Sequence, residues 1–207
     1  MPHYDVTRHR LFFEDLAPKW DTMQPPERIS TINRLIKPFD SFFRKCNSIL
    51  EIGTGTGTLI PILRTRYPET RIFSIDLAHR MLVIAKTKSK ISALIQSDVH
   101  HLPFMRDYFA GVICHNSFPH FANKSTALTE LRRVLQANGN LLILHDNSRE
   151  KVNHIHQHAP SSVIHDDILP PASDLDDLLQ ISGFTTELIE DQSEKYLIYA
   201  KNNGYLI

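Results

Sequence analysis

The stretch "SILEIGTGTGTLIPIL", residues 48–63, constrains the fold of this chain more than any other. An apolar run ends at three closely spaced glycines, Gly53, Gly55 and Gly57, and a second apolar run follows. This order predicts a buried strand, a tight turn and a helix. The chain has only 7 glycines in 207 residues, so their concentration here marks a turn whose backbone is closely approached. A ligand that meets backbone amides at a helix N-terminus fits such a turn.

Strand-like and helix-like segments alternate after this turn. Strands are expected at "RIFSID", "SALIQSD", "AGVICHN" and "NLLILHD", with helices such as "AHRMLVIAKTK" between them. This alternation predicts an α/β fold with a Rossmann-like, doubly wound parallel sheet. The last two strands, "TTELIED" and "KYLIYAK", are too close for a crossover and predict a terminal antiparallel hairpin. With "SILEI" the expected sheet has seven strands.

One helix is expected over "STALTELRRVLQANG", residues 125–139. Leu128, Leu131 and Leu135 have helical spacing. Ser125 is the expected N-cap, and Asn138-Gly139 is the expected end.

The segment before the first strand has a different character. Residues 7–45 have a helical, polar-faced pattern that Pro25 and Pro26 interrupt. We therefore expect an N-terminal helical cap at residues 1–46 and a ligand-binding domain at residues 47–207. A histidine-rich lid insert is expected at residues 147–171 of that domain.

Composition narrows the class of protein. Lys plus Arg and Asp plus Glu both number 23, so the chain lacks the excess of positive charge that is usual in nucleic-acid-binding proteins. Two cysteines, Cys46 and Cys114, make no disulfide framework and favour a reduced, cytoplasmic setting. The N-terminal residues contain no apolar core of signal-peptide length, and no run of apolar residues predicts a membrane span. The sequence leaves the oligomeric state open.

The glycine turn alone does not identify its ligand. The spacing is G-x-G-x-G, and Thr58 stands where a dinucleotide-binding fingerprint has its third glycine. A phosphate loop would need Gly-Lys-Ser or Gly-Lys-Thr, and neither occurs. Asp76 ends the second strand, where a carboxylate can accept both hydroxyls of a ribose. Asp98 follows the third strand.

At this level of detail the sequence resembles a class I S-adenosylmethionine-dependent methyltransferase of the type found in ubiquinone and menaquinone biosynthesis. The resemblance covers about residues 48–146. The matching segments are "ILEIGTGTG", "IFSIDLAHRMLVIAK", "IQSDVHHLPF", "AGVICHNSFPHF" and "ALTELRRVLQANGNLLILHD". It implies S-adenosyl-L-methionine as cofactor and methyl transfer to a small-molecule acceptor.

The resemblance also implies which residues bind the cofactor. Asp76 would bind the ribose, while Leu77, Asp98 and Val99 would lie by the adenine. The glycine turn would hold the methionine portion of the cofactor. The full set carried over by position is Glu51, Gly53, Thr54, Gly55, Gly57, Asp76, Leu77, Asp98, Val99, His115 and Asn116. Two departures are Pro119, where relatives often have a second histidine, and "QANGN", where relatives usually have a proline and paired glycines.

Three histidines that follow strand ends, His115, His120 and His145, are candidates for a catalytic base. Methyl transfer depends mainly on positioning, but an oxygen or nitrogen nucleophile also needs a base with a pKa near 7, which suits histidine. Each of them is alternatively a turn histidine with its hydrogen bonds satisfied. Trp20 and Asp21 have two interpretations: folding over the cofactor, as the resemblance implies, or simple packing of the N-terminal helix.

The histidine-rich stretch at residues 149–171 is unusual. On a helix, His154 and His158 would share one face, and His165, Asp166 or Asp167 would complete a metal site. In an extended conformation His154, His156 and His158 would share a face instead. We expect a solvated lid rather than a metal site, because no cysteine supports the site and the spacing fits no single geometry.

Other functions remain as alternatives. The first is a non-catalytic S-adenosylmethionine-binding protein, and the second is a nicotinamide-dependent oxidoreductase. The third is a metal-assisted methyltransferase that uses the segment 154–167.

Overall fold

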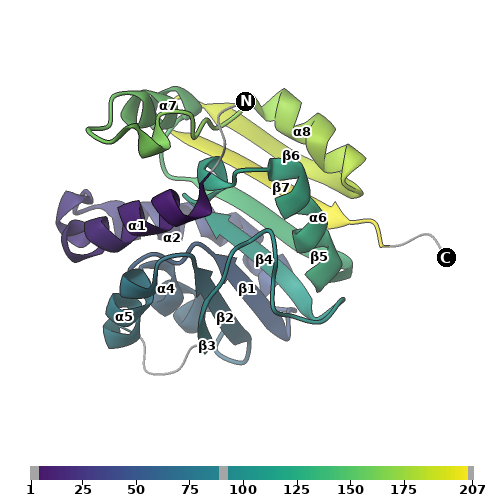
Figure 1. The fold of residues 1–207 in the computed structure, drawn as a ribbon. Helices are drawn as coiled ribbons and strands as arrows, with labels where there is room; N and C mark the ends of the chain where they lie inside the picture. Colours follow the sequence, from purple (N-terminus) through teal and green to yellow (C-terminus); the bar gives the residue numbers. More distant parts are fainter. Residues whose placement is uncertain (1–4, 89–92, 205–207) are drawn as a thin grey trace.

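One seven-stranded sheet forms the centre of this computed structural model, which describes residues 5–88 and 93–204 (Figure 1). The spatial order is β3-β2-β1-β4-β5-β7-β6. Neighbouring strands from β3 to β5 are parallel, and β7 runs antiparallel to both β5 and β6. The strands are β1 (Ser48–Ile52), β2 (Arg71–Asp76), β3 (Ala93–Gln96), β4 (Phe109–His115), β5 (Leu135–His145), β6 (Phe184–Gln192) and β7 (Lys195–Asn202). The predicted Rossmann-like sheet with its terminal hairpin is confirmed.

Helices precede and connect these strands. The α-helices are α1 (Val6–Leu16), α2 (Arg28–Ile36), α3 (Asp40–Phe43), α4 (Leu59–Arg66), α5 (His79–Lys88), α6 (Lys124–Val134), α7 (Arg149–Gln157) and α8 (Ala172–Ile181). Short 3-10 turns are η1 (Ala17–Lys19), η2 (Asp21–Met23), η3 (Lys37–Phe39), η4 (Phe118–His120) and η5 (Ser162–Ile164). The segment before β1 is thus helical, as its pattern predicts.

The sheet is covered on both faces because successive side chains of a strand point to opposite sides. On one face, Leu131 of α6 and Leu175 of α8 pack in one buried cluster with Ile143 of β5. On the other face, Ile32 of α2 packs in a second cluster that contains Leu142 of β5. Adjacent residues of β5 therefore belong to different cores, which fixes the register of the strand.

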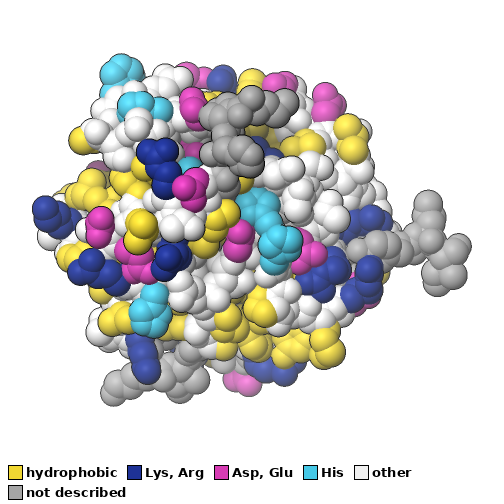
Figure 2. Space-filling model, viewed as in Figure 1, with side chains coloured by type: hydrophobic (Ala, Val, Ile, Leu, Met, Phe, Trp, Pro, Cys, Tyr) yellow, Lys and Arg dark blue, Asp and Glu magenta, His cyan; other side chains and the backbone are white. Residues whose placement is uncertain are grey.

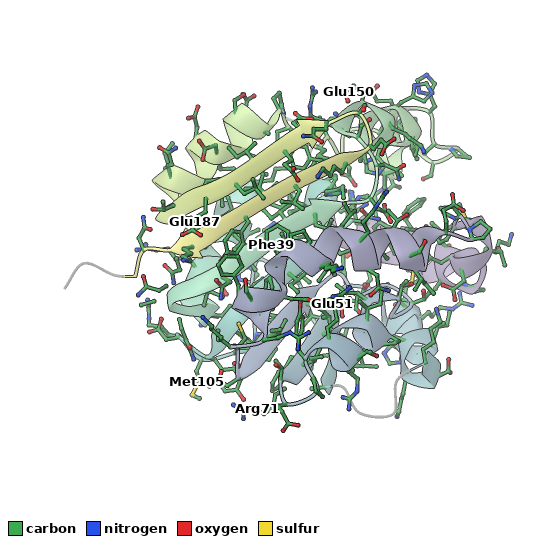
Figure 3. The ribbon with its side chains drawn as sticks, turned by 180° about the vertical axis from the view of Figure 1, so that it is seen from behind. Phe39, Glu51, Arg71, Met105, Glu150 and Glu187 are labelled. Atoms are coloured by element: carbon green, nitrogen blue, oxygen red, sulfur yellow. The ribbon has the colours of Figure 1, made fainter. Side chains whose placement is uncertain are left out.

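The first helices are attached at two places. Phe39 packs against Tyr199 of β7 with ring centroids 5.3 Å apart, and the view from behind shows it between the helices and the sheet (Figure 3). Helix α1 lies instead against α5, where both carboxylate oxygens of Glu14 accept backbone amides, from His79 and Arg80, at 2.7 Å. Because a helix N-terminus favours a negative charge, Glu14 fixes α1 beside the loop that follows β2.

The expected extent of α6 was wrong at both ends. Asn123, not Ser125, is the N-cap, and its side chain accepts from the amide of Thr126. The helix ends at Val134, not at Asn138-Gly139, because Leu135 already pairs with Phe109 of β4. The Asn202 side chain of β7 donates to the Leu135 carbonyl at 2.7 Å, so it satisfies a carbonyl at this helix end.

Across residues 5–88 and 93–204, every helix is too short or too polar to cross a lipid bilayer.

Candidate active site

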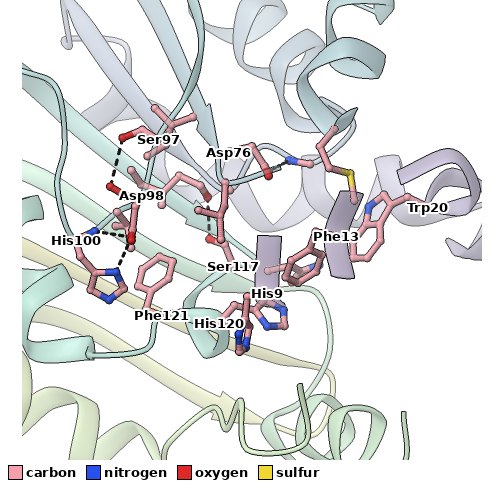
Figure 4. Close-up of a pocket in the computed structure, with 18 residues that line it drawn as sticks. His9, Phe13, Trp20, Asp76, Ser97, Asp98, His100, Ser117, His120 and Phe121 are labelled. Atoms are coloured by element: carbon pink, nitrogen blue, oxygen red, sulfur yellow. Dashed lines mark hydrogen bonds and ion pairs between the residues drawn. The ribbon is translucent and has the colours of Figure 1, made fainter. Parts of the chain in front are cut away.

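A hollow of about 730 Å³, its open mouth included, lies at the carboxyl ends of β1, β2 and β4 (Figure 4). The connection after β1 leads to β2 on one side, while β4 lies on the other side of β1, so the strand order reverses here. Ligands of doubly wound sheets bind at such a reversal. Eight of the residues expected to bind the cofactor or to act as a base line the hollow: Gly53, Gly55, Asp76, Leu77, Asp98, Val99, Asn116 and His120.

Five other expected residues stand behind this lining rather than in it. They are Glu51, Thr54, Gly57, His115 and His145. All five are buried.

The glycine turn places two glycines in different surroundings. Gly53 has a positive φ of 70°, and a Cβ atom there would lie 2.5 Å from the Cβ of Ser117. Gly55 has a φ of 55°, and its Cβ position is 3.7 Å from Trp20 Nε1 at the wall of the hollow. Gly53 therefore permits close packing of the chain on itself, whereas Gly55 leaves backbone open to a ligand.

Asp76 joins the glycine turn to the end of β2. Its Oδ2 accepts from the Gly55 amide at 2.7 Å, and its Oδ1 accepts from the Ala78 amide at 2.9 Å. Burial raises the pKa of the Asp76 carboxyl to about 6, although these backbone hydrogen bonds oppose the shift. Each oxygen has a second lone pair, so the carboxylate can still accept from a ligand's hydroxyl groups.

Glu51 supports the turn from behind. Its Oε2 accepts from Thr54 Oγ1 at 2.9 Å and from Ser74 Oγ at 2.7 Å. Burial raises the pKa of Glu51 to about 7, while the two hydroxyl groups act in the opposite direction. A buried acid whose pKa is shifted this far, next to a hollow, marks a functional region.

Asp98 lies across the hollow from the N-terminal helices (Figure 4). Its Oδ1 accepts from both the amide and the Nδ1 of His100, and the amide of Asn123 donates to His100 Nε2 at 3.2 Å. His100 thus connects Asp98 with the N-cap of α6. Burial alone would raise the pKa of Asp98, but the hydrogen bonds from His100 lower it below its usual value.

Aromatic side chains from the N-terminal helices close the opposite wall. Phe13 of α1 and Trp20 line the hollow together with Phe121, which follows η4 (Figure 4). Phe13 contacts both Trp20 and His120 edge to face, with ring centroids 6.3 Å and 4.9 Å apart. Trp20 therefore both packs on α1 and faces the hollow. The sequence indicated Trp20, but no signal marked Phe13.

Asp21, the neighbour of Trp20, points away from this wall. Its Oδ1 accepts from Thr56 Oγ1 at 2.6 Å, and its Oδ2 pairs with Lys88 Nζ at 2.6 Å. Asp21 therefore fastens the turn after α1 to the glycine turn and to α5.

Of the three candidate bases, only His120 lines the hollow. His145 is 1% exposed, and burial lowers its pKa to about 3. His115 is 7% exposed, and its Nε2 lies 3.6 Å from the carboxylate of Asp146. Burial also lowers the pKa of His115. His115 and His145 thus do not reach the hollow, because the strands that carry them turn their side chains into the packed interior.

Asp146 acts on the hollow indirectly. It pairs with Arg28 Nε at 3.3 Å, and its Oδ1 accepts from Asn116 Nδ2 at 2.6 Å. Asn116 has a positive φ of 53°, a strained conformation that such contacts maintain.

The histidine-rich stretch contains α7, so the helical interpretation of its first half is confirmed. The rings of His154 and His158 lie 4.1 Å apart, and both side chains are exposed. His156 is buried on the opposite side, against His120. In the described part of the chain, no group of three or more His, Cys, Asp and Glu side chains has the arrangement of a metal site.

Comparison with known proteins tests this geometry. Residues 50–143 match the sequence model of a methyltransferase domain. The demethylmenaquinone methyltransferase of Thermotoga maritima is 34% identical over 96 residues, which is 46% of this chain and 42% of the relative. The malonyl-[acyl-carrier protein] O-methyltransferase of Priestia megaterium is 31% identical over 134 residues, 63% of this chain and 48% of that protein. Residues 50–143 of this chain therefore form a methyltransferase domain.

The fold of this methyltransferase domain agrees with solved structures. A Thermotoga maritima protein described as a SAM-dependent methyltransferase and possible histamine N-methyltransferase superposes with a TM-score of 0.72, at 17% identity. The superposition covers 93% of this chain and 99% of that one. The predicted methyltransferase domain is thus confirmed over residues 50–143, and its predicted fold is confirmed by the superposition. The chain spans about half the length of the two sequence relatives described above.

Proposed function

We propose that this protein transfers a methyl group from S-adenosylmethionine to an apolar small-molecule acceptor. The observation that carries the proposal is the position of Asp76, whose carboxylate joins the glycine turn to the end of β2 inside an aromatic-walled hollow. S-adenosylmethionine, when bound, supplies an electrophilic methyl group on a positively charged sulfur. The chain's own residues bind and orient it.

The residues around the hollow fit the cofactor by their chemistry. Asp76 offers lone pairs to the ribose hydroxyls, and Asp98 offers a carboxylate to the adenine amine. Gly55 keeps a Cβ atom out of the space beside Trp20. Glu51 and Thr54 hold the turn from behind through their hydrogen bond. Leu77 and Val99 supply apolar contact for the adenine.

The chemical class of the acceptor is inferred from the aromatic residues that line the hollow. Phe13, Trp20 and Phe121 offer faces and edges for a flat apolar molecule. Relatives named for demethylmenaquinone act on such a molecule, and we extend that acceptor class to this chain. Lys plus Arg and Asp plus Glu are equal in number at 23 each, and both signs are present on the face that Figure 2 shows, which supports a small-molecule acceptor rather than a nucleic acid. A cytoplasmic location stays a prediction from cysteine usage.

We infer that residues 1–46 form a cap over the cofactor and that residues 147–171 form a lid over the acceptor. Support comes from Phe13 and Trp20, which reach the hollow from the segment before β1. His120 is the candidate base, because it is the one histidine of the three that lines the hollow.

Calorimetric titration of the purified protein with S-adenosylmethionine, S-adenosylhomocysteine, NADH and NADPH tests the cofactor assignment. Binding of the first two alone is expected. Binding of only a nicotinamide dinucleotide would establish the oxidoreductase alternative.

A second assay separates the enzyme from a non-catalytic binding protein. Radiolabelled S-adenosylmethionine is incubated with the protein and demethylmenaquinol, with malonyl-[acyl-carrier protein] as the comparison. Transfer of label to the quinol is expected, and label only on the carrier protein would show that the acceptor class is wrong.

A further inference from the structure

Asp167 is a buried carboxylate of the lid that contacts histidines from two other elements. Its Oδ2 lies 2.6 Å from His120 Nδ1, and its Oδ1 lies 3.1 Å from His9 Nε2. The Asp167 side chain is only 9% exposed. His9 belongs to α1 and His120 to η4, so one lid residue joins three separate parts of the chain.

The charge of Asp167 fixes which nitrogen of His120 carries a proton. Burial alone would raise the pKa of Asp167, but the hydrogen bonds from His120 and His9 hold it well below its usual range. An ionised carboxylate only accepts hydrogen bonds, so His120 donates from Nδ1. In the neutral His120 ring the lone pair therefore sits on Nε2.

The His120 ring is also held by packing. The ring centroid of Phe13 lies 4.9 Å from that of His120, and the centroid of His156 lies 4.8 Å away. His156 Nδ1 donates to the backbone carbonyl of Asp167 at 2.6 Å. Contacts of this kind fix a ring orientation that a side chain on a short turn would otherwise not keep.

His9 and His120 both line the hollow, whereas Asp167, which contacts both of them, does not. The two histidines line the hollow beside Phe13, away from Asp98 (Figure 4). The titratable groups that surround Asp167 are His9 from α1, His120 from η4, His156 from α7 and Lys124 from α6. This arrangement of a carboxylate, a histidine and a space for the reacting molecule is that of a positioned general base.

We propose that Asp167 positions His120 to remove a proton from an aromatic hydroxyl group, so that the acceptor is methylated on oxygen. This inference rests on the proposed methyl transfer. The acceptor oxygen forms a bond to the methyl carbon, the carbon–sulfur bond breaks and its electron pair stays on sulfur. The hydroxyl proton passes to His120 Nε2 and later to water, so charge and atoms balance.

An oxygen nucleophile is favoured because it needs this base. The hydroxyl of an aromatic ring has a pKa of about 10 and is almost entirely protonated at neutral pH. A carboxylate is ionised there already, and an aromatic thiol is largely so; neither gains much from a base. The aromatic wall suits the ring, and His120 suits its hydroxyl group.

A matched pair of acceptors tests the proposal: 2-naphthol and 2-naphthalenethiol, which differ in one atom and in acidity. For His120→Gln, kcat on 2-naphthol is expected to fall about 100-fold or more, because a general base contributes at least that factor. The fall on the thiol is expected to be much smaller. The rate of His120→Gln on 2-naphthol should also rise with pH as the free naphthol ionises, more steeply than that of the wild type.

Asp167→Asn tests the positioning role. We expect kcat on 2-naphthol to fall about 10- to 100-fold or more, because His120 loses the carboxylate that fixes its tautomer and orientation, with little change in KM. Asp166→Asn and His154→Gln are matched controls, since both side chains are exposed neighbours, and each should keep the wild-type rates. If Asp167→Asn does not fold, the rates of His120→Gln on the two acceptors test the proposal without it.

The state of His120 is measured without any acceptor by nitrogen NMR of histidine-labelled protein with S-adenosylhomocysteine at pH 8. A protonated Nδ1 and an unprotonated Nε2 are expected, and Asp167→Asn should mix the two tautomers. The opposite tautomer in the wild type overturns the proposal. It is equally overturned if the wild type does not methylate 2-naphthol, or if His120→Gln methylates it as fast as the wild type.

Calorimetry with S-adenosylhomocysteine keeps the two levels of inference apart. Failure of the wild type to bind it overturns the proposed function. Normal binding together with one of the adverse results above overturns only the roles of His120 and Asp167.

Discussion

The Asp76 carboxylate accepts a hydrogen bond from the Gly55 amide at 2.7 Å, although the two residues are 21 positions apart. This bond joins the end of β2 to the turn after β1, and both residues line the same hollow. One contact thus aligns the part of the site expected to bind the ribose with the part expected to bind the methionine portion.

Asp76→Ala should therefore lose cofactor binding while the protein stays folded. We expect the affinity for S-adenosylhomocysteine to fall about 100-fold or more, since each hydrogen bond to a charged group contributes about 1.5–3 kcal/mol. Calorimetry measures the affinity, and circular dichroism checks the fold. Glu69→Ala, on the surface before β2, is the control. An unchanged affinity in Asp76→Ala would refute the ribose assignment.

Trp20 provides a direct optical signal. It is the only tryptophan of the chain, and its side chain lines the hollow. We expect its fluorescence to change in a saturable way on titration with S-adenosylhomocysteine. Trp20→Phe should remove the signal yet still bind the ligand in calorimetry, more weakly than the wild type. If the fluorescence stays constant while calorimetry detects binding, Trp20 does not form the wall of the cofactor site.

The glycine turn allows stability and binding to be separated. In Gly53→Ala the new Cβ would lie 2.5 Å from the Cβ of Ser117, so we expect a loss of about 2–5 kcal/mol in the free energy of unfolding. Gly55→Ala meets only Trp20 Nε1 at 3.7 Å and should cost about 1–2 kcal/mol, from its positive φ. Urea denaturation measures both.

Binding should follow a different order. Gly55→Ala, although well folded, is expected to lose most of its affinity for S-adenosylhomocysteine because its methyl group enters the cofactor space. Retained affinity in this variant would mean that the cofactor does not approach Gly55.

Much of this site was predictable because it is encoded locally. Short sequence patterns identify the strand ends, the glycine turn, Asp76 and Asp98. Because the strands are parallel, their carboxyl ends lie at one edge of the sheet, and these residues come together there. His9 and Asp167 were not predictable as a pair, since 158 positions separate them and only the packing of α1 on the lid brings them together.

The wrong expectations, for the end of α6 and for two of the three candidate bases, also come from contacts between distant parts of the chain. The end of α6 depends on Asn202 of β7, which satisfies the Leu135 carbonyl from a distant part of the chain. The choice between His115, His120 and His145 depends on which way each side chain points at the end of its strand. Propensity and spacing carry neither kind of information.

Glu51 should make stability depend on pH. Folding raises its pKa from 4.5 to about 7, so between these values the folded state binds more protons than the unfolded state. The contribution of Glu51 to stability is thus full below pH 4.5 and is lost as the pH rises to about 7. At pH 8 Glu51→Gln should be more stable than the wild type by about 1–3 kcal/mol, because it removes a buried charge.

The geometry supports this substitution. Ser74 and Thr54 both donate to the same oxygen of Glu51, so the carbonyl of Gln can keep both bonds. Urea denaturation at pH 8 and pH 5 measures the effect, and the gain should shrink at pH 5. Glu150→Gln, an exposed position on the outer rim in Figure 3, should show little change at either pH. A gain of equal size at both pH values would mean that the Glu51 charge is not its cause.

Glu14 should control whether α1 stays on the hollow. Both of its carboxylate oxygens accept amides at the N-terminus of α5, and a Gln side chain can accept with only one oxygen. Glu14→Gln is therefore expected to lower the free energy of unfolding by about 1–3 kcal/mol. Because α1 carries His9 and Phe13, the affinity for S-adenosylhomocysteine should fall as well.

Hydrogen exchange identifies the element that loosens. Amides of α1 should exchange faster in Glu14→Gln, and S-adenosylhomocysteine should slow them in the wild type. Asp15→Asn is the matched control, since the Asp15 side chain is 86% exposed and pairs with Arg80 only at 3.8 Å. If α1 exchanges equally in all three proteins and ligand binding does not protect it, α1 is not a cap on the cofactor, and the walls formed by Phe13 and Trp20 serve packing alone.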